Sequence, residues 1–485
     1  MKSVCLNFQI HQPFRYRKYR FFDIGNDAYY YDDFANETFL RKVADQCYLP
    51  ANKIILEQIR KHKGKFKVTY SLSGVVIDQF KLYAPEVIDS FAELAATGCV
   101  EFLSETYANS LVSLADEKLF ESQVKAHDEL IEELFGYHPK VFRNTELIYS
   151  DELGDLVQRM GYEAMITEGA KHILGWKSPN YLYCNALNPR LKVLMRNFRF
   201  SDDLSFRFSN KGWNEFPLTA EKYAGWMAKL PKEEEIVTIF INYETFGQLH
   251  PKSSGIFDFL ENLPGAILKT GKLNFTTPSE AVNNLQPVSA IHVPYPISWA
   301  DEERDLSAWL GNELQKEAFD KLYQLKDRMS FCTDKTMLKD WDYLQTNDHF
   351  YYMCTKFFSD GEVHKHFNPY STPYEAFINY MNVLSDFKIR LNAIVPKSAK
   401  DEEIANLKEL VNEKSRKLET TENELIKIKK EVSAAKLTQS KKINAAASKV
   451  ETVKPAKKAA SSKVETVKST KKAVTQKPTK KDFPA

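Results

Sequence analysis

The chain has 485 residues, of which 43% are hydrophobic and 13% aromatic. This composition is typical of a globular protein with one large core and additional modules. No apolar run approaches the roughly 20 residues that span a bilayer, which argues against a membrane protein. The N-terminal segment MKSVCLNFQIHQPF lacks the long apolar centre of a signal peptide, so we expect a cytoplasmic protein.

Cysteine spacing and charge set two further limits. The six cysteines are scattered without a CxxC pair, which disfavours a zinc ribbon or a disulfide scaffold and predicts reduced thiols. Residues 439–485 hold 13 lysines and 3 acidic residues, so this tail carries +10 and the rest of the chain −8. The body is therefore mildly acidic and the tail strongly basic.

Short β-rich runs, separated by helical stretches such as 116–135, recur over about the first 280 residues. Near-continuous apolar runs that end in polar residues are typical of parallel strands buried on both faces. The alternation of strand and helix favours an α/β fold, and a β/α barrel over a sandwich. The runs are 3–12, 67–74, 99–107, 140–149, 163–169, 192–197 and 237–244.

The ends of these runs are polar. Barrel enzymes carry their chemistry at the C-terminal ends of the strands. We therefore expect the side chains at these ends to converge on one mouth. They are His11, Gln12, Glu105, Glu146, Asn242, Tyr243 and Glu244.

The remaining chain divides by composition. We place a barrel domain at 1–290 and a helical, aromatic-rich region beside its mouth at 291–395. Within 396–438, apolar residues recur every seven positions over 404–435, which predicts a coiled-coil-like helix that self-associates. Polar seam residues weaken this pattern, so a single amphipathic helix packed on the body stays an alternative. Residues 439–485 repeat SKVETVK without apolar core residues, and we expect a disordered basic tail.

Several motifs that carry polar residues follow one another along the chain. They are HQP at 11–13, GCVEFLSETYANSL at 98–111, FRNTELIYS at 142–150, NYETFGQLHPKSSGIFDFL at 242–260, ISWADEERDLSAWLGN at 297–312 and NDHFYYMCTK at 347–356. In this order, and over about residues 1–390, the chain resembles glycoside hydrolase family 57, an α-amylase-like group that acts on α-glucans.

The resemblance implies an incomplete seven-stranded β/α barrel followed by a helical bundle, and a reaction that retains anomeric configuration. By the family pattern, Glu146 matches the nucleophile and position 242 matches the general acid/base. The expected partner is an α-glucan or maltooligosaccharide, with no cofactor.

The chain departs from the family pattern within these motifs. The family expects Asp-Tyr-Glu-Thr-Phe-Gly-Glu-His where this chain has Asn-Tyr-Glu-Thr-Phe-Gly-Gln-Leu. Asn242 thus replaces the acid, Gln248 a carboxylate and Leu249 a histidine, while Asn109 stands where a further histidine is expected. A retaining glycosidase needs two carboxyl groups about 5–5.5 Å apart. An amide cannot transfer a proton near pH 7, and losing general acid catalysis costs about 10²–10⁴-fold.

Further substrate-binding candidates follow from the motifs. His11 and Trp299 are expected to contact sugar, or else to be core residues, and Asp348 and His349 are added by NDHFYYM. Arg143 lies close enough in sequence to hold Glu146 ionised. Glu244 shares a strand face with Asn242 but lies about 6.6 Å along it, so a structural carboxylate paired elsewhere is the alternative.

Other candidates have less support in the sequence. Trp309 is more often a core residue than a stacking platform, and His250 and Asp301 are possible replacement donors without a fixed position. No set of ligands, His364 and His366 included, shows the spacing of a structural zinc site, so we expect no metal.

Three interpretations of function remain open. The first is a catalytically impaired α-glucan-binding homologue, a possible pseudoenzyme. The second is an active amylase or glucanotransferase with a substitute acid. The third is an oligomeric interaction protein that works through 404–435 and the basic tail, whose lysines could contact nucleic acid weakly.

Overall fold

The computed structural model describes residues 1–356 and 368–395, together with six single residues between 407 and 421. The chain forms two compact units, Met1–Asn406 and Leu407–Ala485. Apart from those six residues, the predicted coiled coil at 404–435 and the predicted disordered tail at 439–485 lie outside the described residues.

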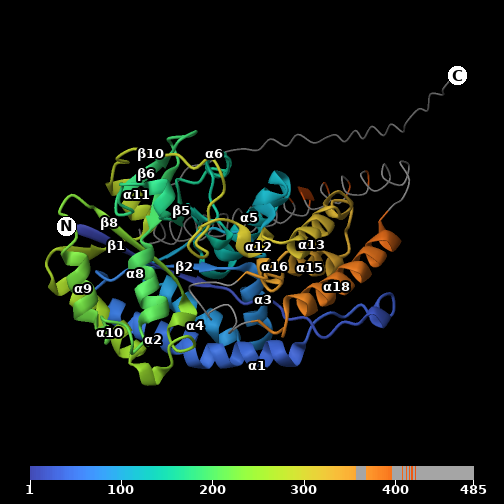
Figure 1. Cartoon of the computed structure of the whole chain (residues 1–485), viewed down its shortest axis with the longest axis horizontal. Helices are drawn as coiled ribbons and strands as arrows, with labels where there is room; N and C mark the ends of the chain where they lie inside the picture. The colour runs from blue at the N-terminus through green and yellow to red at the C-terminus, as the bar shows by residue number, and fades with distance from the viewer. Residues whose placement is uncertain are drawn as a thin grey trace, which may run out of the picture. The chain divides into compact units, whose positions relative to one another are not determined.

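Seven parallel strands of the first unit pair in a ring (Figure 1). Two seams in this ring are narrow: a single bridge, Ser104–Phe142, joins β3 to β4, and one register pair, Arg196–Thr238, joins β7 to β8. The seven strands coincide with the seven predicted runs. They are β1 (Lys2–Ile10), β2 (Val68–Leu72), β3 (Val100–Phe102), β4 (Val141–Arg143), β5 (Ala164–Glu168), β7 (Lys192–Arg196) and β8 (Ile236–Asn242).

Three further strands lie beside the ring. β6 (Leu182–Asn185) pairs antiparallel with β7, and β10 (Ala290–Ile291) pairs with β6. β9 (Leu273–Phe275) pairs with the start of β1. The fold is therefore α/β with a mostly parallel sheet.

Side chains alternate between the two faces of the ring, as they must in strands. On β1, Val4, Leu6, Phe8 and Ile10 belong to an apolar cluster shared with helices. Cys5 packs instead with residues from facing strands, among them Leu103, Val141, Ile166, Leu194 and Phe240. Gln9 shares the inward face with Cys5, so polar side chains continue this inner layer toward the mouth.

The helices of the first part of the chain connect successive strands. A representative is α5, predicted at 116–135: the Asp116 side chain accepts a hydrogen bond from the Leu119 amide at its start, and Gly136 ends it with a φ of 61°. The helices are α1 (Asp33–Val43), α2 (Leu49–Lys61), α3 (Gly74–Tyr83), α4 (Pro85–Ala95), α5 (Glu117–Phe135), α6 (Asp151–Arg159), α7 (Lys171–Leu174), α8 (Phe198–Asp202), α9 (Ala220–Ala228), α10 (Ile256–Lys269) and α11 (Pro278–Asn284).

A helical region follows, as the sequence predicts. It contains α12 (Ser307–Leu310), α13 (Glu313–Tyr323), α14 (Lys326–Met329), α15 (Lys335–Leu344), α16 (Asn347–Tyr351) and α18 (Pro373–Ile394). These helices share one apolar core with α5, α6 and the outer faces of β4, β5 and β7. That shared core fixes the helical region against the strands. Among the described residues, no helix is long and apolar enough to cross a membrane.

Candidate active site

A pocket opens where the inner faces of β1, β4 and β8 end. We call it the polar pocket. It brings together eight residues singled out from the sequence: His11, Gln12, Glu146, Asn242, Glu244, Trp299, Trp309 and Asp348. Its other lining residues are Gln9, Pro13, Asn347, Tyr351 and Tyr352.

Glu146 lies on a tight turn, Thr145–Leu147, directly after β4. Its φ of 56° and that of Leu147, 54°, fall in the left-handed region, where side chains other than glycine are strained. Strained backbone is often found at functional sites, where contacts with the surrounding structure stabilise it. Trp299 makes two such contacts with Glu146. Its indole Nε1 donates to Oε2 at 2.5 Å, and its backbone amide donates to the Glu146 carbonyl at 3.3 Å.

Burial raises the pKa of Glu146 above its usual value. The positive charge of Arg143 and the hydrogen bond from Trp299 oppose this rise without cancelling it. Burial therefore destabilises the ionised carboxylate, and Arg143 and Trp299 offset only part of this cost.

Asn242 is the last residue of β8, and its register partner on β1 is Gln9. Both side chains line the polar pocket. Among the residues that the structure describes, none hydrogen-bonds either side-chain amide. Gln9 is absent from the site candidates predicted from the sequence. It precedes His11 by two positions, and residues two apart in a strand lie on the same face, so this spacing could have identified it.

Glu244 follows β8 on the turn Tyr243–Thr245. Its Oε1 accepts hydrogen bonds from the Tyr48 hydroxyl at 2.5 Å and from Nε2 of Gln12 at 3.1 Å. Burial raises the pKa of this carboxyl, and the hydrogen bonds from Tyr48 and Gln12 lower it only in part. Glu244 thus fits both descriptions considered from the sequence: it is paired within the barrel and it lines the pocket.

His11 joins β1 to the helical region. Its Nε2 lies 2.9 Å from Oδ2 of Asp348, at the start of α16, and its Nδ1 lies 2.7 Å from the Ser73 hydroxyl. Burial alone would raise the pKa of Asp348, but the adjacent His11 outweighs it and holds that pKa below the usual value. The helical region therefore contributes a carboxylate to the polar pocket.

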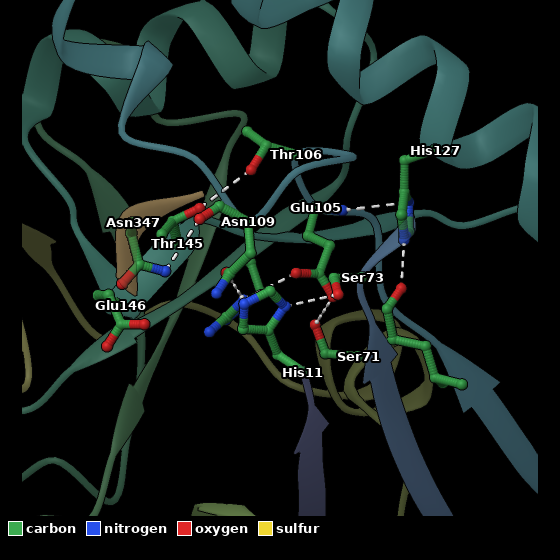
Figure 2. A network of polar contacts seen from close by, with 12 residues as sticks. His11, Ser71, Ser73, Glu105, Thr106, Asn109, His127, Thr145, Glu146 and Asn347 are labelled. Carbon is green, nitrogen blue, oxygen red and sulfur yellow. Dashed lines mark hydrogen bonds and ion pairs between the residues drawn. The ribbon is translucent and has the colours of Figure 1, made fainter. Parts of the chain in front are cut away.

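Two predicted contacts lie outside the pocket lining. Arg143 points into the barrel beneath it, fully buried, and donates to Glu105 at 2.9 Å and to Oδ1 of Asn109 at 3.1 Å. Figure 2 shows the surrounding network, in which Glu105 also accepts from Ser71. Arg143 thus forms its ion pair with Glu105, and acts on Glu146 only through its charge.

His349 is a core residue. Its ring stacks on Tyr16 with centroids 4.4 Å apart, and its Nε2 lies 3.1 Å from the Tyr343 carbonyl. Burial lowers its pKa to about 4, so the ring is neutral at pH 7. Successive residues of a helix point about 100° apart, which explains why Asp348 enters the pocket and its neighbour does not.

Of the remaining candidates, Trp309 lies in the pocket lining, whereas His250 and Asp301 lie outside it. Nε1 of Trp309 donates to Oδ1 of Asn347 at 3.1 Å. His250 is buried, with Nε2 facing the carbonyls of Leu204 and Ser205. Asp301 pairs with Lys356 at 3.1 Å. Among the described residues, no group of three or more His, Cys, Asp or Glu side chains is placed to hold a metal.

A second, smaller pocket adjoins the first and shares Gln9, Asn242 and Trp299 with it. We call it the apolar pocket, because its other lining residues are Leu147, Phe206, Phe240, Ile241 and Leu249, with Ser205 and Arg196. Asn242 and Trp299 therefore stand at the junction of two adjacent spaces.

Comparison with known proteins identifies the scaffold. The model of glycosyl hydrolase family 57 matches residues 5–294. The chain belongs to this family. A curated protein of Methanocaldococcus jannaschii named "Putative alpha-amylase" is 41% identical over 411 residues, which cover 82% of this chain and 86% of that protein.

Several solved structures share the fold at low sequence identity, among them a family 57 branching enzyme. A branching enzyme from Thermococcus kodakaraensis superimposes with a TM-score of 0.58 at 15% identity, over 83% of this chain and 94% of that one. The α-amylase AmyC from Thermotoga maritima gives 0.52 at 12% identity, over 84% and 96%. The 4-α-glucanotransferase from Thermococcus litoralis gives 0.50 at 17% identity over 72% of this chain, which spans half the length of that enzyme.

Proposed function

We propose that this family 57 chain binds an α-glucan in the polar pocket and cleaves it poorly. In this proposal Glu146 keeps the place of the nucleophile and Asn242 takes the place of the acid/base. His11, Glu244, Trp299 and Asp348 contact the sugar, while Arg143 tunes Glu146 from below and His349 supports α16. The observation that carries the proposal is that Glu146 and Asn242 line one pocket, with no described residue hydrogen-bonded to the Asn242 amide.

The chemistry of the two side chains supports this division. Glu146 is held by Trp299 on a strained turn, as a preorganised group would be. The Asn242 amide can donate a hydrogen bond to a glycosidic oxygen but cannot protonate it. Departure of a sugar hydroxyl therefore lacks the acid on which retaining glycosidases depend.

A substitute acid is the second candidate. Glu244 lines the same pocket, and burial raises its pKa. The side-chain hydrogen bonds from Tyr48 and Gln12 both engage Oε1. In this candidate the proton is carried by Oε2. This candidate makes the chain an active amylase or glucanotransferase, with the family's usual acid replaced.

The C-terminal segments suggest a role that is compatible with either candidate. Self-association through 404–435 and contact of the basic tail with an acidic partner remain proposals from the sequence. Removing residues 397–485 tests the first of them, because light scattering would then give the mass of one shortened chain where the unaltered protein gives the mass of a dimer.

Binding and cleavage are tested together. We expect calorimetry to show maltooligosaccharide binding by the unaltered chain and by E146Q, and we expect little or no reducing-end release from either. Release by the unaltered chain that E146Q abolishes would favour the substitute-acid candidate. If neither the unaltered chain nor E146Q binds maltooligosaccharide, the proposal is wrong.

A further inference from the structure

The loop that carries Trp299, residues 298–305, is closed on itself and strained. The Ser298 amide donates to the Arg304 carbonyl at 3.0 Å. Asp301 and Arg304 each have a φ of 52°, in the left-handed region. Residues other than glycine keep this backbone conformation only where surrounding contacts stabilise it. The loop therefore depends on contacts with other parts of the chain.

Arg304 makes such a contact, because its two terminal nitrogens bond in different directions. Nη1 donates to the Trp299 carbonyl, and Nη2 forms an ion pair with Oδ2 of Asp202, on α8, at 3.6 Å. The guanidinium also lies over the ring of Phe198, with its central carbon 5.6 Å from the ring centroid. A planar guanidinium can hold two acceptors in a fixed relative geometry. Arg304 therefore joins the backbone at Trp299 to α8.

Asp202 is in turn held by the ends of the barrel strands. Its Oδ1 accepts a hydrogen bond at 2.5 Å from Nη2 of Arg196, at the end of β7. Nη1 of Arg196 donates to Glu168, at the end of β5, at 3.0 Å, and Nε donates to the Phe240 carbonyl of β8 at 2.8 Å. The Arg196 and Glu168 side chains are buried, so salt screens their charges weakly. The position of Arg304 thus depends on the ends of three strands.

These contacts converge on the hydrogen bond between Trp299 and Glu146. The strength of a hydrogen bond falls steeply as its distance and angle depart from the ideal, so a small displacement of the Trp299 backbone would weaken it. We infer that Arg304 is a positioning residue, which fixes the loop so that the indole N–H stays directed at the Glu146 carboxylate. Arg304 lies outside both pocket linings. This inference rests on the proposed function and adds a residue to it.

The indole N–H resonance of Trp299 reports this hydrogen bond without any ligand. In a sample labelled with nitrogen-15 it is identified by its absence from W299F, and a bond to a carboxylate moves it downfield of a free indole. In R304M the resonance should move upfield. D202N, which removes the charge that Arg304 faces, should move it in the same direction and decides if R304M does not fold. The matched control is R60M, at an arginine whose side chain is 62% exposed, and it should leave the resonance in place.

Covalent labelling of Glu146 by α-maltosyl fluoride gives the second readout. R304M should slow labelling at least about fivefold, as expected for the loss of one hydrogen bond. Because Arg304 acts through the indole, the double variant W299F/R304M should be labelled as fast as W299F, within about twofold. If Arg304 instead stabilised the fold independently of the indole, the two effects would multiply.

The outcomes separate this inference from the proposed function. A resonance that stays in place in R304M and D202N would overturn the inference alone, as would multiplied effects in the double variant. Absence of labelling in the unaltered chain would overturn the place given to Glu146 in the proposed function, and the inference with it.

Discussion

The indole Nε1 of Trp299 donates a 2.5 Å hydrogen bond to Oε2 of Glu146, across 153 positions of sequence. The same tryptophan receives a hydrogen bond at its carbonyl from Arg304, whose guanidinium lies 3.6 Å from Asp202. A loop of the helical region thus reaches across the barrel mouth and holds the carboxyl group on its strained turn. The proposed nucleophile depends on two parts of the chain.

W299F should weaken the reactivity of Glu146 and shift its pH dependence. A hydrogen bond to a carboxylate lowers its pKa, so removing the indole N–H raises the pKa of Glu146. The ionised form attacks, so the pH below which labelling by Glu146 falls off moves to a higher value. Covalent labelling by α-maltosyl fluoride, followed by mass spectrometry from pH 4 to 8, measures this shift. W226F, at a tryptophan within α9 that packs against the first apolar cluster, is the control. An unmoved acid limb in W299F would contradict the assigned role.

R143M should destabilise the fold. Arg143 and Glu105 form an ion pair in which both side chains are fully buried. Removing one partner leaves an uncompensated buried charge, at a cost of about 3–5 kcal/mol in free energy of unfolding. The double variant R143M/E105L should recover part of that loss. Urea unfolding measures both, and R60M is the control because Arg60 and Glu93 are 62% and 57% exposed, where the cost is below about 1 kcal/mol. A loss in R143M no larger than in R60M would count against this reading.

His349 should make stability depend on pH. Burial lowers its folded pKa to about 4, whereas the unfolded ring titrates near 6.5. Between these values the unfolded chain binds the extra proton, so the free energy of unfolding falls as pH drops from about 6.5 to 4 and then levels off. The full change is about 3 kcal/mol. H349Q should show a correspondingly smaller difference between pH 7 and pH 4, measured by urea unfolding. H138Q, at a ring whose side chain is 73% exposed, should behave like the unaltered chain, and an equal drop in H349Q would refute the assignment.

E244Q should weaken the binding of maltooligosaccharide, whereas its effect on cleavage should be small. A charged hydrogen bond to a sugar hydroxyl is worth about 1.5–3 kcal/mol, so the Kd for maltooligosaccharide should rise about tenfold or more. Calorimetry measures this change, and E233Q, at a glutamate outside both pockets on the loop before β8, serves as control. If E244Q instead keeps its affinity and abolishes a reducing-end release that the unaltered chain shows, Glu244 is the acid.

Much of the scaffold can be predicted because its signals are local. Each inner strand is an apolar run that ends in polar residues, and parallel strands in a ring bring such ends together. That reasoning places His11, Glu146, Asn242 and Glu244 at one pocket. The proposal that position 242 takes the place of the acid rests on the family pattern and not on these local signals.

The pairings within the site are not local. Nothing near FRNTELIYS indicates that Arg143 pairs with Glu105 while Trp299 binds Glu146, since both contacts depend on distant segments. The sequence also gives no reason to separate Asp348 from His349, because helix orientation decides which of them faces the pocket. The apolar pocket is equally hidden, as Phe206 and Leu249 meet only in the fold.

The most direct measurement is reducing-end release from maltooligosaccharides by N242D beside the unaltered chain. Asp has nearly the shape of Asn, so binding should change little, whereas a restored acid should raise turnover by about 10²-fold or more. The double variant N242D/E146Q should show none of this gain. If N242D turns over no faster than the unaltered chain while binding glucan equally well, the amide at 242 is not what limits cleavage, and the central claim is wrong.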